Sequence, residues 1–82
     1  MNFAWDRAKA RQNRSKHRVS FEDAATVFGD PLAISYPDPE HCISEQRFIT
    51  LGLSSNGQIL IIAHADSGET ARIISARQGN QK

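Results

Sequence analysis

Hydrophobic and polar positions divide the chain into a helical first part and a strand-rich second part. One helix is marked by four apolar residues at spacings of three and four, which form a single stripe: Phe21, Ala24, Ala25 and Phe28. Ser20, followed three residues later by Asp23, resembles a capping box at the start of this helix. Gly29 in a left-handed conformation and then Pro31 predict its end.

An earlier segment is compatible with a helix but has no such stripe. Asp6 is a candidate N-cap, and residues 7–14 are helix formers of mostly polar or charged character. Because this helix has almost no large apolar side chain of its own, Phe3 and Trp5 must anchor it. Trp5 is therefore expected in the core and not on a surface that stacks nucleic-acid bases.

After Pro31 the pattern becomes that of strands. We expect four, over residues 32–36, 47–53, 58–65 and 70–76. Asn56-Gly57 ahead of an apolar run predicts a hairpin, and residues 66–69 form a second turn. The predicted fold class is α+β, with two N-terminal helices packed on one face of a four-stranded, mainly antiparallel sheet. Residues 1–82 form one domain, and residues 78–82 are a frayed tail.

The charges are separated along the chain, although the net charge is only +1. Residues 1–18 hold six of the ten Lys and Arg residues against one acid, whereas residues 19–46 hold six acids and no Lys or Arg. This asymmetry predicts one basic and one acidic face. A local basic field attracts a polyanion whatever the total charge, so a nucleic-acid substrate is compatible with the composition.

Several classes of protein are excluded by what the sequence lacks. Its longest apolar run, Ile59 to Ala63, is far shorter than the ~20 residues of a membrane helix, and the N-terminal residues do not form a signal peptide. The single cysteine, Cys42, cannot form an internal disulfide, which indicates a reducing compartment or indifference to redox state. The three histidines have no metal-ligand spacing, and no glycine-rich phosphate loop is present. We therefore expect a cytoplasmic protein without a metal or cofactor.

The candidate chemistry lies in cations near the ends of the predicted elements. Lys16-His17 ends the first helix, Arg47 opens a strand, and Arg72 and Arg77 belong to the last strand. Strand alternation predicts that Arg72 and Arg77 lie on opposite faces. Structural roles stay open for several of these residues: a helix-dipole interaction for His17, a cross-strand pair for Arg47, an ion pair with Glu45 or Glu69 for Arg72, and half-buried packing for His64.

Five segments resemble, in order and spacing, the BrnT-type toxins, and together they cover residues 2–77. The segments are Phe3-x-Trp5-Asp6-x-x-Lys9, Asn13-x-x-Lys16-His17-x-Val19-Ser20-Phe21-Glu22-x-Ala24, Phe28-x-Asp30-Pro31, Glu45-x-Arg47-Phe48-Ile49-Thr50-x-Gly52 and Arg72-Ile73-Ile74-Ser75-Ala76-Arg77. The resemblance implies a small cytosolic bacterial ribonuclease with a RelE-like fold. It also implies a BrnA-like ribbon-helix-helix antitoxin, through which alone the complex binds and represses its operator DNA.

The resemblance implies that the cations take part in RNA cleavage. RNA is cut without metal when its 2′-hydroxyl attacks the adjacent phosphorus, which requires a base, an acid and positive donors around the phosphate. By resemblance, the candidate catalytic residues are Lys16, His17, Arg47, Arg72 and Arg77. Arg72 and Arg77 are cast as phosphate clamps, and His17 as a proton exchanger that Lys16 orients or assists. Arg47 is a third electrostatic contributor.

Two departures from the family pattern leave other interpretations open. Arg18 stands where the family usually has Gly, and the basic C-terminal helix of the family is expected to be absent or shortened. Loss of that helix would expose a sheet face or edge and favour a homodimer. The main alternative is therefore a catalytically weak or inactive toxin fold that serves as antitoxin-binding partner and co-repressor. A plain nucleic-acid-binding module is a third interpretation, although it lacks aromatic stacking residues on the strands.

Overall fold

The structure, a computed structural model, describes residues 2–38 and 46–79. In this part of the chain it contains two helices and five strands. In chain order they are β1 (Asn2–Ala4), α1 (Arg7–His17), α2 (Phe21–Val27), β2 (Ile34–Pro37), β3 (Arg47–Leu53), β4 (Ile59–Ser67) and β5 (Thr70–Gln78). The α+β class and both helices are confirmed. Among the described residues no helix follows β5 and none is long and apolar enough to cross a membrane.

All five strands form one mixed sheet in the order β1-β5-β4-β3-β2. Strands β2 to β5 pair antiparallel, and β1 pairs parallel with β5. The prediction of four strands is therefore wrong by one. Strand β1 has only three residues, too few to show an alternating pattern, and its partner β5 lies at the other end of the sequence.

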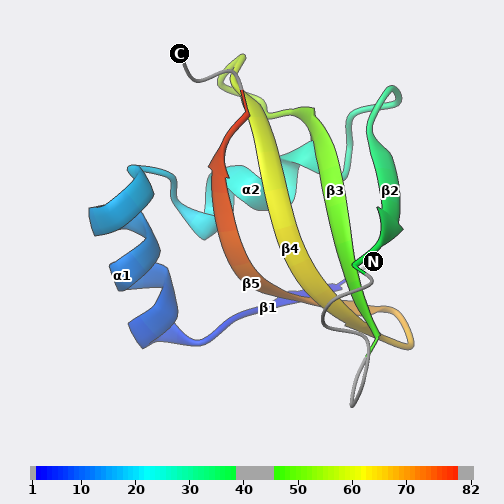
Figure 1. The fold of residues 1–82 in the computed structure, drawn as a ribbon, viewed down its shortest axis with the longest axis horizontal. Helices are drawn as coiled ribbons and strands as arrows, with labels where there is room; N and C mark the ends of the chain where they lie inside the picture. Colours follow the sequence, from blue (N-terminus) through cyan, green and yellow to red (C-terminus); the bar gives the residue numbers. More distant parts are fainter. Residues whose placement is uncertain (1, 39–45, 80–82) are drawn as a thin grey trace.

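The helices cover the sheet unequally (Figure 1). Helix α2 crosses behind the sheet, whereas α1 stands beside β5 at one edge, so only α2 fully meets the expectation that both helices cover one face. The core between α2 and the sheet consists of eight buried residues: Val19, Phe21, Ala24, Val27, Leu60, Ile62, Ile73 and Ala76. Trp5 packs edge-on against Phe21 with ring centroids 5.9 Å apart, which confirms it as a core anchor.

The helix ends differ from expectation in two places. Ser20 Oγ accepts a hydrogen bond of 3.0 Å from the Asp23 N–H, as the capping box predicts. Asp6 occupies the N-cap of α1, but its side chain makes no capping hydrogen bond. Gly29 is not left-handed: among the described residues, positive φ angles occur only at Arg18, Gly57 and Gly68.

The two predicted hairpins are present. Gly57, with φ 83°, closes the β3–β4 turn by donating its N–H to the Ser54 carbonyl at 2.9 Å. Gly68, with φ 62°, stands in the β4–β5 turn. Positive φ favours glycine, because an L side chain there crowds the following carbonyl.

A β-bulge changes which face the late cations occupy. The register runs from Ala63 opposite Ser75 to His64 opposite Ile73, so Ile74 has no partner on β4. As a result Arg72 lies opposite Ala65 and Arg77 opposite Ile61, two positions on the same face of β4. The prediction of opposite faces for Arg72 and Arg77 is therefore wrong, because an extra residue shifts the alternation by one. His41, Cys42 and Glu45 lie outside the described residues, so the expectations about Cys42 and an Arg72–Glu45 pair stay untested.

Candidate functional site

The last turn of α1 concentrates positive charge. It carries Arg14, Lys16 and His17, at the helix end where the exposed carbonyls favour cations. Arg18 then takes the left-handed conformation, with φ 61° and ψ 33°, and its N–H donates to the Arg14 carbonyl at 2.9 Å. This is the geometry that a glycine normally supplies at such a helix end, so Arg18 holds it against a steric cost.

Asn13 fixes α1 against β5. Its side-chain amide donates to the carbonyls of Val19 at 3.0 Å and Ala76 at 2.8 Å, and its side-chain oxygen accepts from the Ala76 N–H at 3.1 Å. Asn13 thus satisfies both main-chain groups of Ala76, as a neighbouring strand would. It is buried, with 6% exposure, although it stands on a largely polar helix. The last turn of α1 is thereby held beside the end of β5.

This packing creates a hollow between α1 and β5, which we call the basic hollow. It measures about 400 Å³, and its lining residues are Lys16, His17, Arg18, Arg77 and Gln78. A second depression of about 230 Å³ adjoins it, because Lys16 and His17 line both. Three of the five predicted site residues, Lys16, His17 and Arg77, therefore converge at one place.

The other two predicted site residues lie elsewhere on the sheet. Arg47 on β3 and Arg72 on β5 are both in register with Ala65 on β4, so they stand two strands apart, about 10 Å between Cα atoms. Arg72 and Arg77 share a face but are separated along β5 by roughly 15 Å. The structure thus forms two cationic regions on one sheet face and does not unite all five residues in one pocket.

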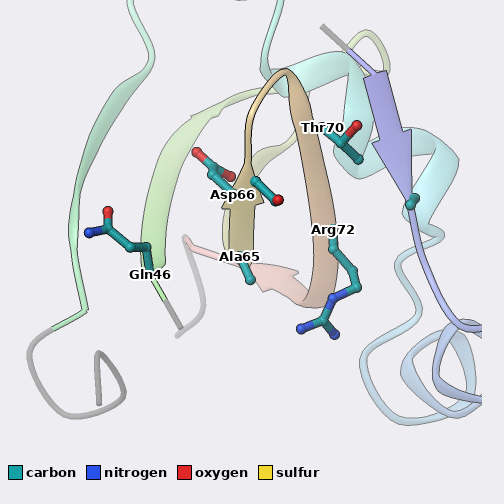
Figure 2. Close-up of a pocket in the computed structure, with 7 residues that line it drawn as sticks. Gln46, Ala65, Asp66, Thr70 and Arg72 are labelled. Carbon is teal, nitrogen blue, oxygen red and sulfur yellow. The ribbon is translucent and has the colours of Figure 1, made fainter. Parts of the chain in front are cut away.

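Arg72 lines a hollow of about 500 Å³ (Figure 2), which we call the Arg72 hollow. Its other lining residues are Ala4, Gln46, Ala65, Asp66, Ser67 and Thr70. Figure 2 shows that these residues come from separate segments, with Arg72 on β5, Asp66 on β4 and Gln46 just ahead of β3. These polar side chains do not converge on one ligand position: Arg72 is opposite Ala65 and Asp66 is opposite Ala71, so the guanidinium and the carboxylate lie on opposite faces of the sheet.

The Asp66 carboxylate is fixed by a hydrogen bond from buried His64. His64 Nδ1 contacts Asp66 Oδ1 at 2.7 Å, and His64 Nε2 contacts Thr50 Oγ1 at 2.7 Å. Thr50 Oγ1 in turn contacts Ser35 Oγ at 2.6 Å. Because a carboxylate only accepts, Nδ1 donates to Asp66, and in the neutral imidazole Nε2 then accepts from the Thr50 hydroxyl. The chain of hydrogen bonds runs from the Arg72 hollow to Ser35 on the outer strand β2.

His64 is more deeply placed than predicted. Its exposure is 2%, and its ring packs edge-on against Phe28 at 4.9 Å and stacks on Phe48 at 6.0 Å, between centroids. The expected half-buried packing role is wrong in degree, because two hydrogen-bond partners allow complete burial of the polar ring.

The Asp30 carboxylate accepts two backbone hydrogen bonds. Oδ1 accepts from the Leu32 N–H at 3.0 Å, and Oδ2 accepts from the Leu53 N–H at 2.9 Å. These two backbone hydrogen bonds hold the pKa of the Asp30 carboxyl below its usual value, because they favour the charged form. Asp30 therefore joins the loop after α2 to the end of β3.

Sequence reasoning missed three polar residues that shape these regions: Asn13, Gln46 and Asp66. A signal existed for Asn13, which precedes Lys16 by about one helical turn and so points toward the same side. Asp66 looked like a turn residue, since nothing local shows its bond to His64. In the part of the chain that the structure describes, no three His, Cys, Asp or Glu side chains gather as a metal-binding group.

Comparison with known proteins identifies the fold and the family. Residues 5–82 match the family model described as "Ribonuclease toxin, BrnT, of type II toxin-antitoxin system". The crystal structure of the Brucella abortus ribonuclease toxin BrnT is similar, with a TM-score of 0.76, 24% sequence identity and coverage of 99% of each chain. A comparison with curated protein sequences gave no match. The family match spans nearly the whole chain, and the chain therefore belongs to the BrnT family of ribonuclease toxins of type II toxin–antitoxin systems.

Proposed function

We propose that the chain is a metal-independent endoribonuclease toxin of a BrnT/BrnA-like module. It acts in the cytoplasm, cuts RNA by 2′-hydroxyl attack and so inhibits translation. A BrnA-like ribbon-helix-helix antitoxin neutralises it and carries the complex to operator DNA. The observation that carries the proposal is the convergence of Lys16, His17 and Arg77 at the basic hollow of a chain in a ribonuclease toxin family.

The chemistry assigned to this hollow is a transesterification. A base removes the proton of the 2′-hydroxyl, the 2′-oxygen bonds to phosphorus, and the bond to the 5′-oxygen breaks as that oxygen receives a proton from an acid. The products are a 2′,3′-cyclic phosphate and a 5′-hydroxyl end. His17 exchanges these protons, Arg77 contacts the phosphate oxygens as a two-point donor, and Lys16 adds charge and orients His17.

Arg47 and Arg72 serve the same RNA strand at a distance from the reacting phosphate. They lie on the sheet face that also carries Arg77, too far from it to share one phosphate. We assign them to flanking phosphates, whose contacts release counterions and make binding dependent on salt. Their replacement is then expected to weaken RNA binding more than it slows bound-state cleavage.

Cleavage of a labelled RNA in EDTA tests the proposal. His17→Ala and Arg77→Ala are expected to reduce the rate about 100-fold or more, since each removes a proton carrier or a charge donor. Arg14→Ala is the matched control, because Arg14 lies on α1 but lines no part of the basic hollow. Wild-type rates in both site variants, or complete loss of wild-type activity in EDTA, would contradict the mechanism.

A second candidate function follows from Arg18. This residue lines the basic hollow where the family pattern expects glycine, so its long side chain occupies space near the proposed phosphate position. If the Arg18 side chain blocks that position, the chain is a catalytically weak or inactive toxin fold, which binds the antitoxin and acts as a co-repressor. Absence of cleavage by wild-type protein, with activity gained by Arg18→Gly and antitoxin binding retained throughout, would favour this second function.

A further inference from the structure

Large hydrophobic side chains are exposed together at one corner of the sheet. In the described part of the chain five such residues stand out: Leu32 (84% exposed), Ile34 (57%), Tyr36 (49%), Leu53 (48%) and Ile59 (43%). Four of them line one hollow of about 340 Å³, together with Asp30, Leu51 and Gly52. We call Leu32, Ile34, Leu51, Leu53 and Ile59 the apolar patch. Single exposed hydrophobic residues are ordinary, but a contiguous group marks an interaction surface.

The sheet register places this patch on the face that α2 does not cover. Ile34 on β2 is opposite Leu51 on β3, and Leu53 on β3 is opposite Ile59 on β4. Figure 1 shows α2 behind the sheet and α1 beside β5, at the edge away from β2. Within the described residues, β2 is the last strand of the sheet and all four of its residues are exposed.

Hydrogen bonds and close packing join the segments that carry the patch. The same Asp30 carboxylate binds the N–H groups of Leu32 and Leu53, one on each side of the hollow. At Gly52 an added Cβ would lie 2.8 Å from both Ala33 Cβ and Val27 Cγ1, so β3 and the segment after α2 are in close contact there. A preorganised surface loses little conformational entropy when a partner binds, which makes this patch suited to tight docking.

The charge around the patch restricts the partner. Asp30 lines the hollow, and no Lys or Arg is among the described residues that line it. The carboxylate disfavours an RNA strand at this corner, and the proposed RNA contacts Arg47, Arg72 and Arg77 lie farther along the same sheet face. Symmetric pairing of two copies through the patch would bring both Asp30 carboxylates into one interface. The complementary partner therefore presents apolar side chains beside a Lys or Arg.

We propose that the apolar patch is the docking surface for the antitoxin, which binds it through a segment that combines apolar side chains with a basic residue facing Asp30. This inference rests on the proposed function, which supplies the antitoxin as partner. Ile34 on β2 is three strands away from β5, about 14 Å across the sheet, and Leu53 on β3 is two strands away, whereas Ile59 on β4 lies beside β5. Substitutions at Ile34 and Leu53 therefore weaken antitoxin binding without changing RNA cleavage.

The experiment measures both activities on the same variants. The purified chain is titrated with the BrnA-like ribbon-helix-helix antitoxin by calorimetry, and its RNA cleavage rate is measured without antitoxin. Ile34→Lys and, separately, Leu53→Lys are expected to weaken antitoxin binding at least 10-fold, since each removes apolar contact and adds charge facing a basic segment. Cleavage is expected to stay within twofold of wild type. Arg77→Ala is the reverse control, with cleavage lost and antitoxin binding retained.

Each other outcome has a separate meaning. Wild-type antitoxin affinity in both lysine variants, with thermal unfolding showing them folded, would overturn the docking surface but leave the ribonuclease proposal standing. Failure of wild-type protein to bind the antitoxin would overturn the antitoxin part of the proposed function as well. Should light scattering show a dimer that Ile34→Lys converts to monomer, while antitoxin affinity is unchanged, the patch would be an interface between two copies and the proposal would be wrong.

Discussion

Replacing Asn13 with alanine tests how the last turn of α1 is attached to the sheet. The substitution removes three hydrogen bonds: two donated to the carbonyls of Val19 and Ala76, and one accepted from the Ala76 N–H. Because Asn13 is buried, water cannot fully replace these bonds. The main-chain groups of Ala76 would lose the partner that Asn13 supplies.

The expected loss of stability follows from these three bonds. At about 0.5–1.5 kcal/mol each, they contribute roughly 1.5–4.5 kcal/mol. Alanine returns up to about 0.7 kcal/mol through its better helix propensity. The net loss is therefore about 1–4 kcal/mol, which at roughly 4–8 °C per kcal/mol in a domain of this size lowers Tm by roughly 4–30 °C.

Urea denaturation and thermal unfolding of Asn13→Ala measure this loss directly. Gln12→Ala is the matched control, since the neighbouring Gln12 is an exposed amide on the same helix. Asn13→Asp is expected to be at least as damaging, because a carboxylate cannot donate to either carbonyl. A loss below about 0.5 kcal/mol in Asn13→Ala, within the range of surface substitutions, would refute the claim that Asn13 attaches α1 to β5.

Three further predictions concern the backbone, the buried network and pH. Arg18→Gly is expected to raise the free energy of unfolding by about 0.5–1 kcal/mol in urea titrations, because it relieves the left-handed conformation at φ 61°. His64→Leu is expected to lower it by about 1–3 kcal/mol in the same titrations, because the hydroxyl of Thr50 loses its buried partner. The folded-state pKa of Asp30 lies below its unfolded value, so Asp30 contributes stability that is present above about pH 4 and is lost as pH falls through the folded pKa. Asp30→Asn is therefore expected to lower Tm at pH 7 more than at pH 2.5.

Each of these expectations has a result that contradicts it. Equal or lower stability of Arg18→Gly would mean that Arg18 gains more from its side chain than it loses to backbone strain. A stable His64→Leu variant would show that apolar packing against Phe28 and Phe48 replaces the hydrogen bonds. A Tm difference between Asp30→Asn and wild type that does not shrink in acid would refute the role given to the charged carboxylate.

Most of the fold could be predicted from local sequence patterns. The stripe from Phe21 to Phe28 defined α2, and Asn56-Gly57 defined the β3–β4 hairpin, because both signals lie within a few residues of one another. Strand β1 could not be predicted, since its three residues become a strand only by pairing with β5. The bulge at Ile74 could not be predicted either, because a residue without a partner is recognised only once the two strands are aligned.

The candidate site likewise combines features that local sequence predicts with features that depend on long-range contacts. The residues at the end of α1 were predictable as a cationic group from their spacing and from the family pattern. Their meeting with Arg77 depends on Asn13, which spans 63 positions to Ala76 and leaves no local signal. The separation of Arg47 and Arg72 from Arg77 likewise follows from strand order and the bulge, neither of which can be read from the residues alone.

The most direct test of the central claim is the chemistry of the RNA ends that wild-type protein produces in EDTA. The mechanism assigned to Lys16, His17 and Arg77 predicts fragments with a 2′,3′-cyclic phosphate on one side of the cut and a 5′-hydroxyl on the other. Fragments with a 5′-phosphate, or cleavage that occurs only when a divalent metal is added, would contradict it.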